Sequence, residues 1–107
     1  MVLTRPVKHT IVERVQRDPA FAKALLDEAA TLFLNGEPHA ARLVLRDLVN
    51  ATMDFETLAR ETAKPAKSLH RMLSSRGNPS MDNLAAIFGV LRKRLGVELH
   101  AHAVKAA

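Results

Sequence analysis

Residues 55–73 read FETLARETAKPAKSLHRML. Apolar side chains recur at helical spacing on both sides of a break near residues 63–65, which predicts two short helices separated by about three residues. Leu58, Leu69 and Met72 are placed to lock the two helices together, and the small Ala59 suits a close crossing. This spacing is typical of a helix-turn-helix, in which the second helix lies in the DNA major groove and the first crosses the backbone.

The second of these helices has a polar face. A projection of residues 64–76 at about 100° per residue places two groups on opposite sides: Leu69, Met72, Leu73 and Arg76, against Lys67, His70, Arg71 and Ser74. Arginine and lysine donate to guanine or to phosphate, and an alanine methyl can contact a thymine methyl. We therefore predict base-facing residues at Ala66, Lys67, His70, Arg71 and Ser74. We predict phosphate contacts from Lys64, Arg76, Asn78 and Ser80.

The charge of the chain is unevenly distributed. The 107 residues carry a net charge of +5, but residues 1–59 sum to −1 and residues 60–107 to +6. No acidic residue occurs from Thr62 to Met81, where Lys64, Lys67, Arg71 and Arg76 all lie. Such an imbalance indicates a polyanionic partner, of which nucleic acid is the first candidate, and on charge alone a solvated basic face is an equal alternative.

The rest of the chain is also helical in its apolar period. We expect helices at 10–17 and 19–35, followed by a third with Pro38 at its start. Start signals precede the helices: Thr10 with Glu13 as a capping box, Asp18 before Pro19, Pro38, Asp54, Pro65 and Ser80. The last helix ends at Gly96 and has an apolar stripe of Met81, Leu84, Phe88, Leu91 and Leu95.

The tail changes to a two-residue period. Val97, Leu99, Ala101 and Ala103 alternate with Glu98, His100 and His102, a pattern typical of a half-buried strand. A lone strand is unstable, so this one needs a partner from the N-terminus or from a second copy of the chain.

These patterns predict an all-α bundle of five to six helices with a short C-terminal β-strand. We expect one domain over 1–107, with N-terminal helices at 1–36, a helix-turn-helix core at 37–96 and a strand or tail at 97–107. The chain contains no cysteine, which excludes disulfides and thiol catalysis. The longest apolar stretch, residues 85–91, is too short to span a membrane, and residues 1–9 hold no apolar core of signal-peptide length, so we expect a cytoplasmic protein.

Between residues 28 and 99 the sequence resembles a known family. The resembling pieces are LNGEP at 34–38, LRDL at 45–48, LARET at 58–62, KSLHRMLS at 67–74 and GNPSMDNL at 77–84. The chain is similar to the antidote (antitoxin) proteins of HigA-like addiction modules, which are small members of the lambda-repressor-like helix-turn-helix superfamily. The resemblance implies a five-helix domain that binds operator DNA as a dimer, with an RNA-cleaving toxin as a second partner. It places the family's base-reading positions on Ala66, Lys67, His70 and Arg71.

The sequence departs from the family pattern in the turn. Ala63 stands where glycine is usual, Lys64 where an apolar residue is usual, and Pro65 where a serine or threonine cap is usual. These departures put the geometry of the turn, rather than the fold, in question.

From these residues we expect a DNA-binding transcriptional regulator on the nucleoid, specifically an autorepressing antitoxin that acts as a homodimer on double-stranded operator DNA. The alternatives are a protein inhibitor that mainly neutralises a toxin and a stand-alone repressor. RNA binding is disfavoured, because the chain lacks Tyr and Trp and no phenylalanine lies on the basic face. No nucleophile motif or glycine-rich phosphate loop is present, so we expect no enzyme activity and no cofactor.

Three further features have simpler interpretations. His100 and His102 share a strand face, but two ligands near a chain end do not make a metal site, so we expect no metal. Arg92, Lys93 and Arg94 could reach phosphate, but cations in a last turn also offset the helix dipole, which we favour. The apolar stripe of 19–35 is either a partner surface or, more often for such stripes, core.

Overall fold

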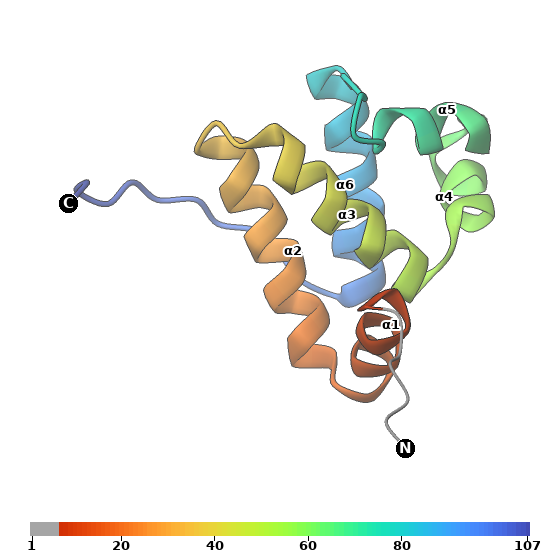
Figure 1. Cartoon of the computed structure of the whole chain (residues 1–107), viewed down its shortest axis with the longest axis horizontal. Coiled ribbons are helices and arrows are strands. Elements are labelled where there is room, and N and C mark those ends of the chain that lie inside the picture. The colour runs from red at the N-terminus through yellow and green to blue at the C-terminus, as the bar shows by residue number, and fades with distance from the viewer. Residues whose placement is uncertain (1–6) are drawn as a thin grey trace.

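Six α-helices form the regular structure of residues 7–107, the part of the chain that this computed structural model describes, with side chains from Thr10 onward (Figure 1). They are α1 (Val7–Arg17), α2 (Pro19–Leu34), α3 (Pro38–Thr52), α4 (Phe55–Thr62), α5 (Ala66–Met72) and α6 (Met81–Leu95). The expectation of a helical bundle is thereby confirmed for the described residues.

Local side-chain caps set the starts of α2, α4 and α6. The Asp18 carboxylate accepts from the Ala20 N–H at 3.1 Å, with Pro19 at the first helical position of α2. The Ser80 hydroxyl accepts from the Asn83 N–H at 3.1 Å and begins α6 in the same way. At the other end of α6, Gly96 adopts φ +66°, the left-handed conformation that glycine reaches without steric cost.

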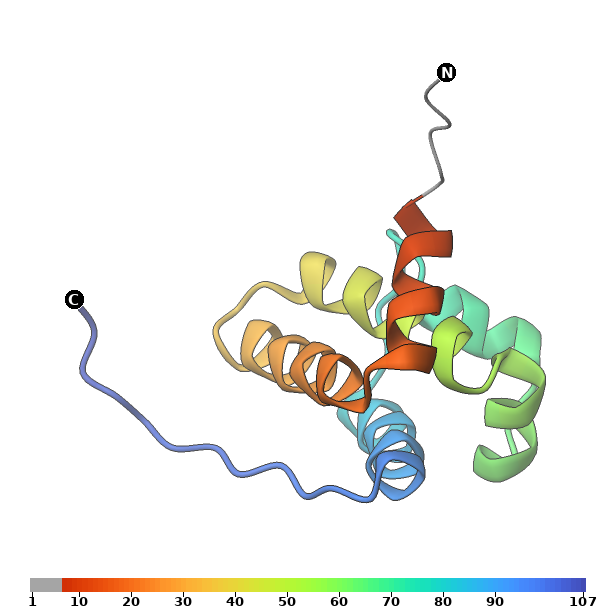
Figure 2. The ribbon, with the colours of Figure 1, turned by 90° about the horizontal axis from the view of Figure 1, so that it is seen from below.

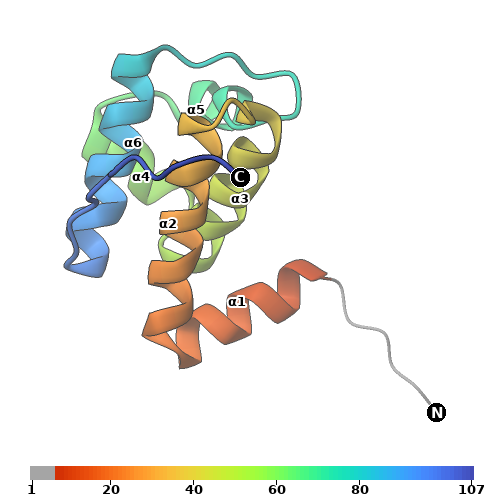
Figure 3. The ribbon, with the colours of Figure 1, turned by 90° about the vertical axis from the view of Figure 1, so that its left-hand side faces the viewer.

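The core lies where α3 meets its neighbours. Helices α2 and α3 run side by side in opposite directions, and α1 packs across them (Figures 1 and 3). Seen from below, α4 and α5 lie on one side of α3, and the C-terminal tail leaves on the other (Figure 2). The fully buried side chains come from α2 to α6 and the residue after α5: Leu26, Leu45, Leu48, Val49, Leu58, Leu69, Leu73, Ile87 and Leu91. Each such burial stabilises the fold by about 1.5–3 kcal/mol.

Three details of the expected helices were wrong. The first helix begins at Val7, so Thr10 lies inside it and is no cap. The fifth helix, which we expected to begin with Pro65 itself, begins at Ala66, with Pro65 as the extended residue before it. Met81 is 78% exposed rather than core, because it is the first residue of α6 and lies at the open rim between α6 and α2.

The C-terminal strand is not seen in the described chain. Residues 97–107 continue α6 as an extended segment without strand pairing. The physical reason is that a strand needs a hydrogen-bonded neighbour, and no described segment of the same chain lies beside it in that way.

No described helix has both the length and the apolar character that a membrane span requires. The expectation about a signal-like segment at residues 1–9 falls in part on residues 1–6, which lie outside the described residues.

Candidate nucleic-acid interface

Helices α4 and α5 form a packed pair joined by residues 63–65 (Figure 1). Phe55 and Leu58 from α4 are buried, as are Leu69 of α5 and Leu73, the residue after α5. Met72 is half-buried and packs against the same core. Although α5 is short, its orientation is therefore fixed by several buried side chains.

The turn between them is left-handed despite its lack of glycine. Ala63 adopts φ 56° and ψ 37°, and the Lys64 N–H donates to the Ala59 carbonyl at 3.2 Å to close the end of α4. For a residue with a Cβ this conformation costs about 1–2 kcal/mol. Pro65 then supplies an extended residue, φ −64° and ψ 138°, before α5, with no side-chain cap. The departures in the sequence thus leave a tight turn in place.

Of the five predicted base-facing residues, three are exposed and two are half-buried. Lys67, His70 and Arg71 are exposed, whereas Ala66 and Ser74 are half-buried. The ammonium of Lys67 and the guanidinium of Arg71 have no hydrogen bond or ion pair with any described residue. Both cations are therefore available to an external anion.

His70 and Ser74 have partners inside the chain. The imidazole of His70 stacks on the Phe55 ring, with 3.9 Å between the ring centroids and 22° between the planes. The Ser74 hydroxyl donates to the Arg71 carbonyl at 2.8 Å and closes the last turn of α5. The Ser74 hydroxyl is thus used within its own turn, and one ring face of His70 is covered by Phe55, whereas Lys67 and Arg71 have no partner in the described chain.

The predicted phosphate residues lie on the segments before and after α5. Lys64 is half-buried in the turn, while Arg76, Asn78 and Ser80 are exposed in the segment that leads to α6. The Ser80 oxygen is already an acceptor for the Asn83 N–H, which leaves its O–H free to donate. The predicted residues therefore lie along one continuous segment, 64–80, rather than in a closed pocket.

A buried arginine that the sequence interpretation missed holds the end of α5. Arg42 of α3 is 9% exposed, and its Nε and Nη2 donate to the carbonyls of Ser74 and Ser75, each at 3.1 Å. A cation at this position also offsets the negative end of the helix dipole. The signal in the sequence was an arginine on the apolar face of α3, three residues before Leu45 and seven before Val49.

Gly77 allows the segment after α5 to pass close to that helix. The Gly77 N–H donates to the Ser74 carbonyl at 3.0 Å. A Cβ at this position would overlap the carbonyl oxygens of Arg71 and Met72. Arg42 and Gly77 together fix the C-terminal end of α5 and the start of the path to α6.

The second basic run, at the end of α6, has partners. Arg94 Nη2 lies 3.3 Å from the Glu61 carboxylate, and Arg92 Nη1 donates to the Val97 carbonyl at 3.4 Å. Lys93 is exposed. Two of these three cations thus stabilise the junction of α6 with α4 and with the tail.

No group of three metal-ligating side chains occurs in the part of the chain that is described. His100 lies 3.6 Å from the Glu98 carboxylate, and both side chains are exposed, as is His102. No family model, no curated protein and no solved structure matches this chain.

Proposed function

We propose that the chain is a sequence-specific DNA-binding regulator in which α4 and α5 act as a helix-turn-helix and α5 enters the major groove. One observation supports this most: Lys67 and Arg71 are exposed and without partners in the described chain, on a helix fixed by buried Leu69 and Leu73. Free cations on a rigid helix are suited to phosphate and base contacts, because no internal bond must break first.

The spacing of the cations fits a groove. Lys67 and Arg71 are four residues apart and so share one face of α5. Lys64 and Arg76 lie beyond the two ends of the helix, and in this proposal they contact the phosphates on either side of the groove. Arg71 can bind guanine through two parallel hydrogen bonds, which a lysine cannot do.

The biological role that we propose is an autorepressing antitoxin that binds its operator as a homodimer on the nucleoid. The resemblance to HigA-like antidotes supports this, and the alternatives are an inhibitor that mainly neutralises a toxin and a stand-alone repressor. Co-expression with the toxic product of a neighbouring gene separates the toxin-binding roles from the stand-alone repressor: restored growth supports an antitoxin or an inhibitor, and unchanged growth supports the stand-alone repressor. Operator binding then distinguishes the autorepressing antitoxin from the inhibitor.

DNA binding is tested by fluorescence anisotropy with labelled DNA from upstream of the gene against scrambled DNA, at about 150 mM salt. The label belongs on the DNA because the protein has no Trp or Tyr. We expect tight binding to the upstream DNA alone, and a fall in log K with log salt of about 0.9 per phosphate contacted. Equal and weak binding to both DNAs would contradict sequence-specific recognition.

A further inference from the structure

The C-terminal tail is anchored at its start and extended beyond it. The Val97 N–H donates to the Arg92 carbonyl at 3.0 Å, and the Arg92 guanidinium donates to the Val97 carbonyl. Val97 and Leu99 also pack against the core. The tail then runs past α2, away from α4 and α5 (Figures 1 and 2). The body of the protein therefore fixes the direction in which this segment leaves.

The backbone of this tail lacks partners. From Glu98 onward, no backbone hydrogen bond to another described residue is formed. The segment nevertheless has the alternation of a half-buried strand, with Leu99, Ala101 and Ala103 on one side. An extended segment with a row of free N–H and C=O groups is a template for pairing with another strand.

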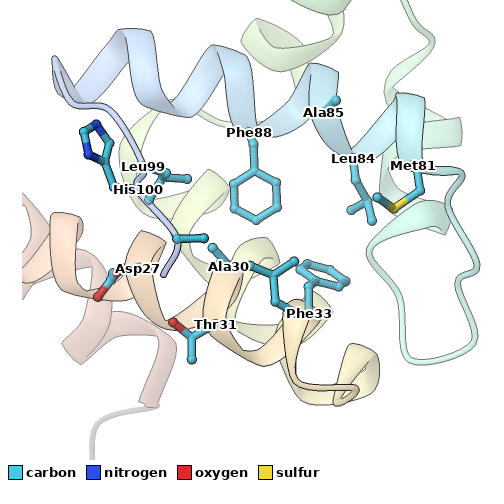
Figure 4. A pocket seen from close by; sticks show the side chains of 12 residues that line it. Asp27, Ala30, Thr31, Phe33, Met81, Leu84, Ala85, Phe88, Leu99 and His100 are labelled. Atoms are coloured by element: carbon cyan, nitrogen blue, oxygen red, sulfur yellow. The ribbon is translucent and has the colours of Figure 1, made fainter. Parts of the chain in front are cut away.

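An apolar groove lies beside the tail. Leu99 and His100 form one wall of a groove of about 490 Å³ whose other walls are α2 and α6 (Figure 4). Leu34 and Met81, which are 69% and 78% exposed, line the same groove. Apolar side chains that are exposed together along one groove, rather than scattered singly, are a feature of surfaces that bind another chain.

We propose that residues 97–103 pair with the same segment of a second copy as an antiparallel two-stranded ribbon beside this groove. The occupant is a second copy because the segment complements itself. A register centred on His100 places Glu98 opposite His102 of the other copy, and Leu99 opposite Ala101 of the other copy, so that polar and apolar side chains each meet their own kind. Because a two-fold axis relates the two copies, each of these cross-strand pairs occurs twice in the ribbon.

The ribbon extends the proposed function, because a two-fold dimer presents two copies of α5 to two half-sites of an operator. It is nevertheless measured without DNA. If the chain is a dimer of this kind but does not distinguish operator from scrambled DNA, the proposed function fails and the ribbon stands. If the chain binds the operator as a monomer, the ribbon fails and DNA binding stands.

The test is sedimentation equilibrium of the full chain and of single proline variants. We expect the wild type to have twice the 11.8 kDa of one chain. In an antiparallel pair, successive N–H groups point alternately toward and away from the neighbouring strand, and proline removes the N–H. Ala101→Pro and Ala103→Pro should therefore have the same effect on dimerisation, and His102→Pro should have the other effect. Variants that remove an N–H directed at the second copy should dimerise about tenfold or more weakly, while variants that remove an outward N–H should stay dimeric.

Ala106→Pro is the matched control, because Ala106 is exposed like Ala101 but lies beyond the alternating segment. All of these positions are exposed in an extended tail, so circular dichroism should show the same helix content in every variant. A monomeric wild type, a dimer that no proline weakens, or equal weakening at residues 101, 102 and 103 would each overturn the ribbon.

Discussion

Two basic clusters of this chain differ in what their charges do. The α5 cluster comprises Lys64, Lys67, Arg71 and Arg76, and the α6 cluster comprises Arg92, Lys93 and Arg94. In the described chain no α5-cluster side chain has an internal partner, whereas Arg94 pairs with Glu61 and Arg92 with the Val97 carbonyl. Charge density along a sequence therefore does not measure availability; the position of the nearest acceptor does.

Arg42 is the extreme case of a cation occupied within the fold, and its removal should have the largest effect. We expect Arg42→Ala to lower the free energy of unfolding by about 3 kcal/mol, because hydrogen bonds from a charged donor are each worth about 1.5–3 kcal/mol. The measurement is urea unfolding followed by circular dichroism. Arg46→Ala, on the same helix and without a partner among the described residues, is the control and should stay within about 0.5 kcal/mol of the wild type. Equal losses for the two variants would show that the bonds to Ser74 and Ser75 are unimportant.

Two glycines test whether the close approach after α5 matters. Gly77→Ala should lower the free energy of unfolding by about 1–3 kcal/mol, because the methyl group overlaps backbone carbonyls that cannot rotate away. Gly89→Ala in α6 meets nothing within 4 Å and should instead raise it by about 0.5–1 kcal/mol. Thermal unfolding of both variants checks the opposite signs. A neutral Gly77→Ala would mean that the segment 74–79 shifts freely, and that α5 is less firmly held than we infer.

The comparison of the two clusters predicts different effects on DNA binding. Arg71→Ala should weaken operator binding by about 1–3 kcal/mol if the guanidinium contacts a base. Arg94→Ala should leave operator binding unchanged and lower stability by at most about 1 kcal/mol, since its ion pair with Glu61 is exposed. Anisotropy titrations of both variants against operator and scrambled DNA make the measurement. If Arg94→Ala weakened binding as much as Arg71→Ala, the distinction between the clusters would be lost.

A substitution in the turn between α4 and α5 should have a smaller effect on the free energy of unfolding. Ala63→Gly should raise the free energy of unfolding by about 0.5–1 kcal/mol, because a left-handed residue with a Cβ costs about 1–2 kcal/mol and glycine loses more backbone entropy by about 0.5–1 kcal/mol. The control is Ala40→Gly inside α3, where glycine should destabilise instead. A loss of stability in Ala63→Gly would argue against the left-handed turn.

The features that the sequence predicted well are those that depend on neighbours along the chain. Asp18 and Ser80 cap helices that begin at the next residue, so each signal lies within the turn that it stabilises. The exposure of Lys67 and Arg71 follows in the same way from the apolar period of α5.

The features that it missed depend on contacts distant in sequence or on another chain. Arg42 reaches a carbonyl 32 residues away, and no local pattern contains that distance. The stacking of His70 on Phe55 requires the approach of α4 to α5, which the spacing of apolar residues does not fix. The C-terminal alternation predicted a strand that the described chain does not form, because strand pairing requires a neighbour and no described segment provides one.

The smallest expected effect comes from a carboxylate on the turn before α4. The N–H of Thr57 donates to Asp54 at 2.8 Å and lowers the pKa of this carboxyl below its ordinary value of 3.8. Because the folded pKa is the lower one, the charged cap stabilises the fold above the unfolded pKa, and this contribution is lost as pH falls through the folded pKa.

Asp54→Asn isolates this titration, since asparagine keeps a capping oxygen but does not ionise. The midpoint of thermal unfolding should be higher for the wild type than for the variant at neutral pH, and the difference should shrink below the ordinary pKa of aspartate. The side chain is exposed, so solvent screens the charge and the difference is modest. A gap that persists unchanged at low pH would assign the effect to the shape of the side chain and not to its charge.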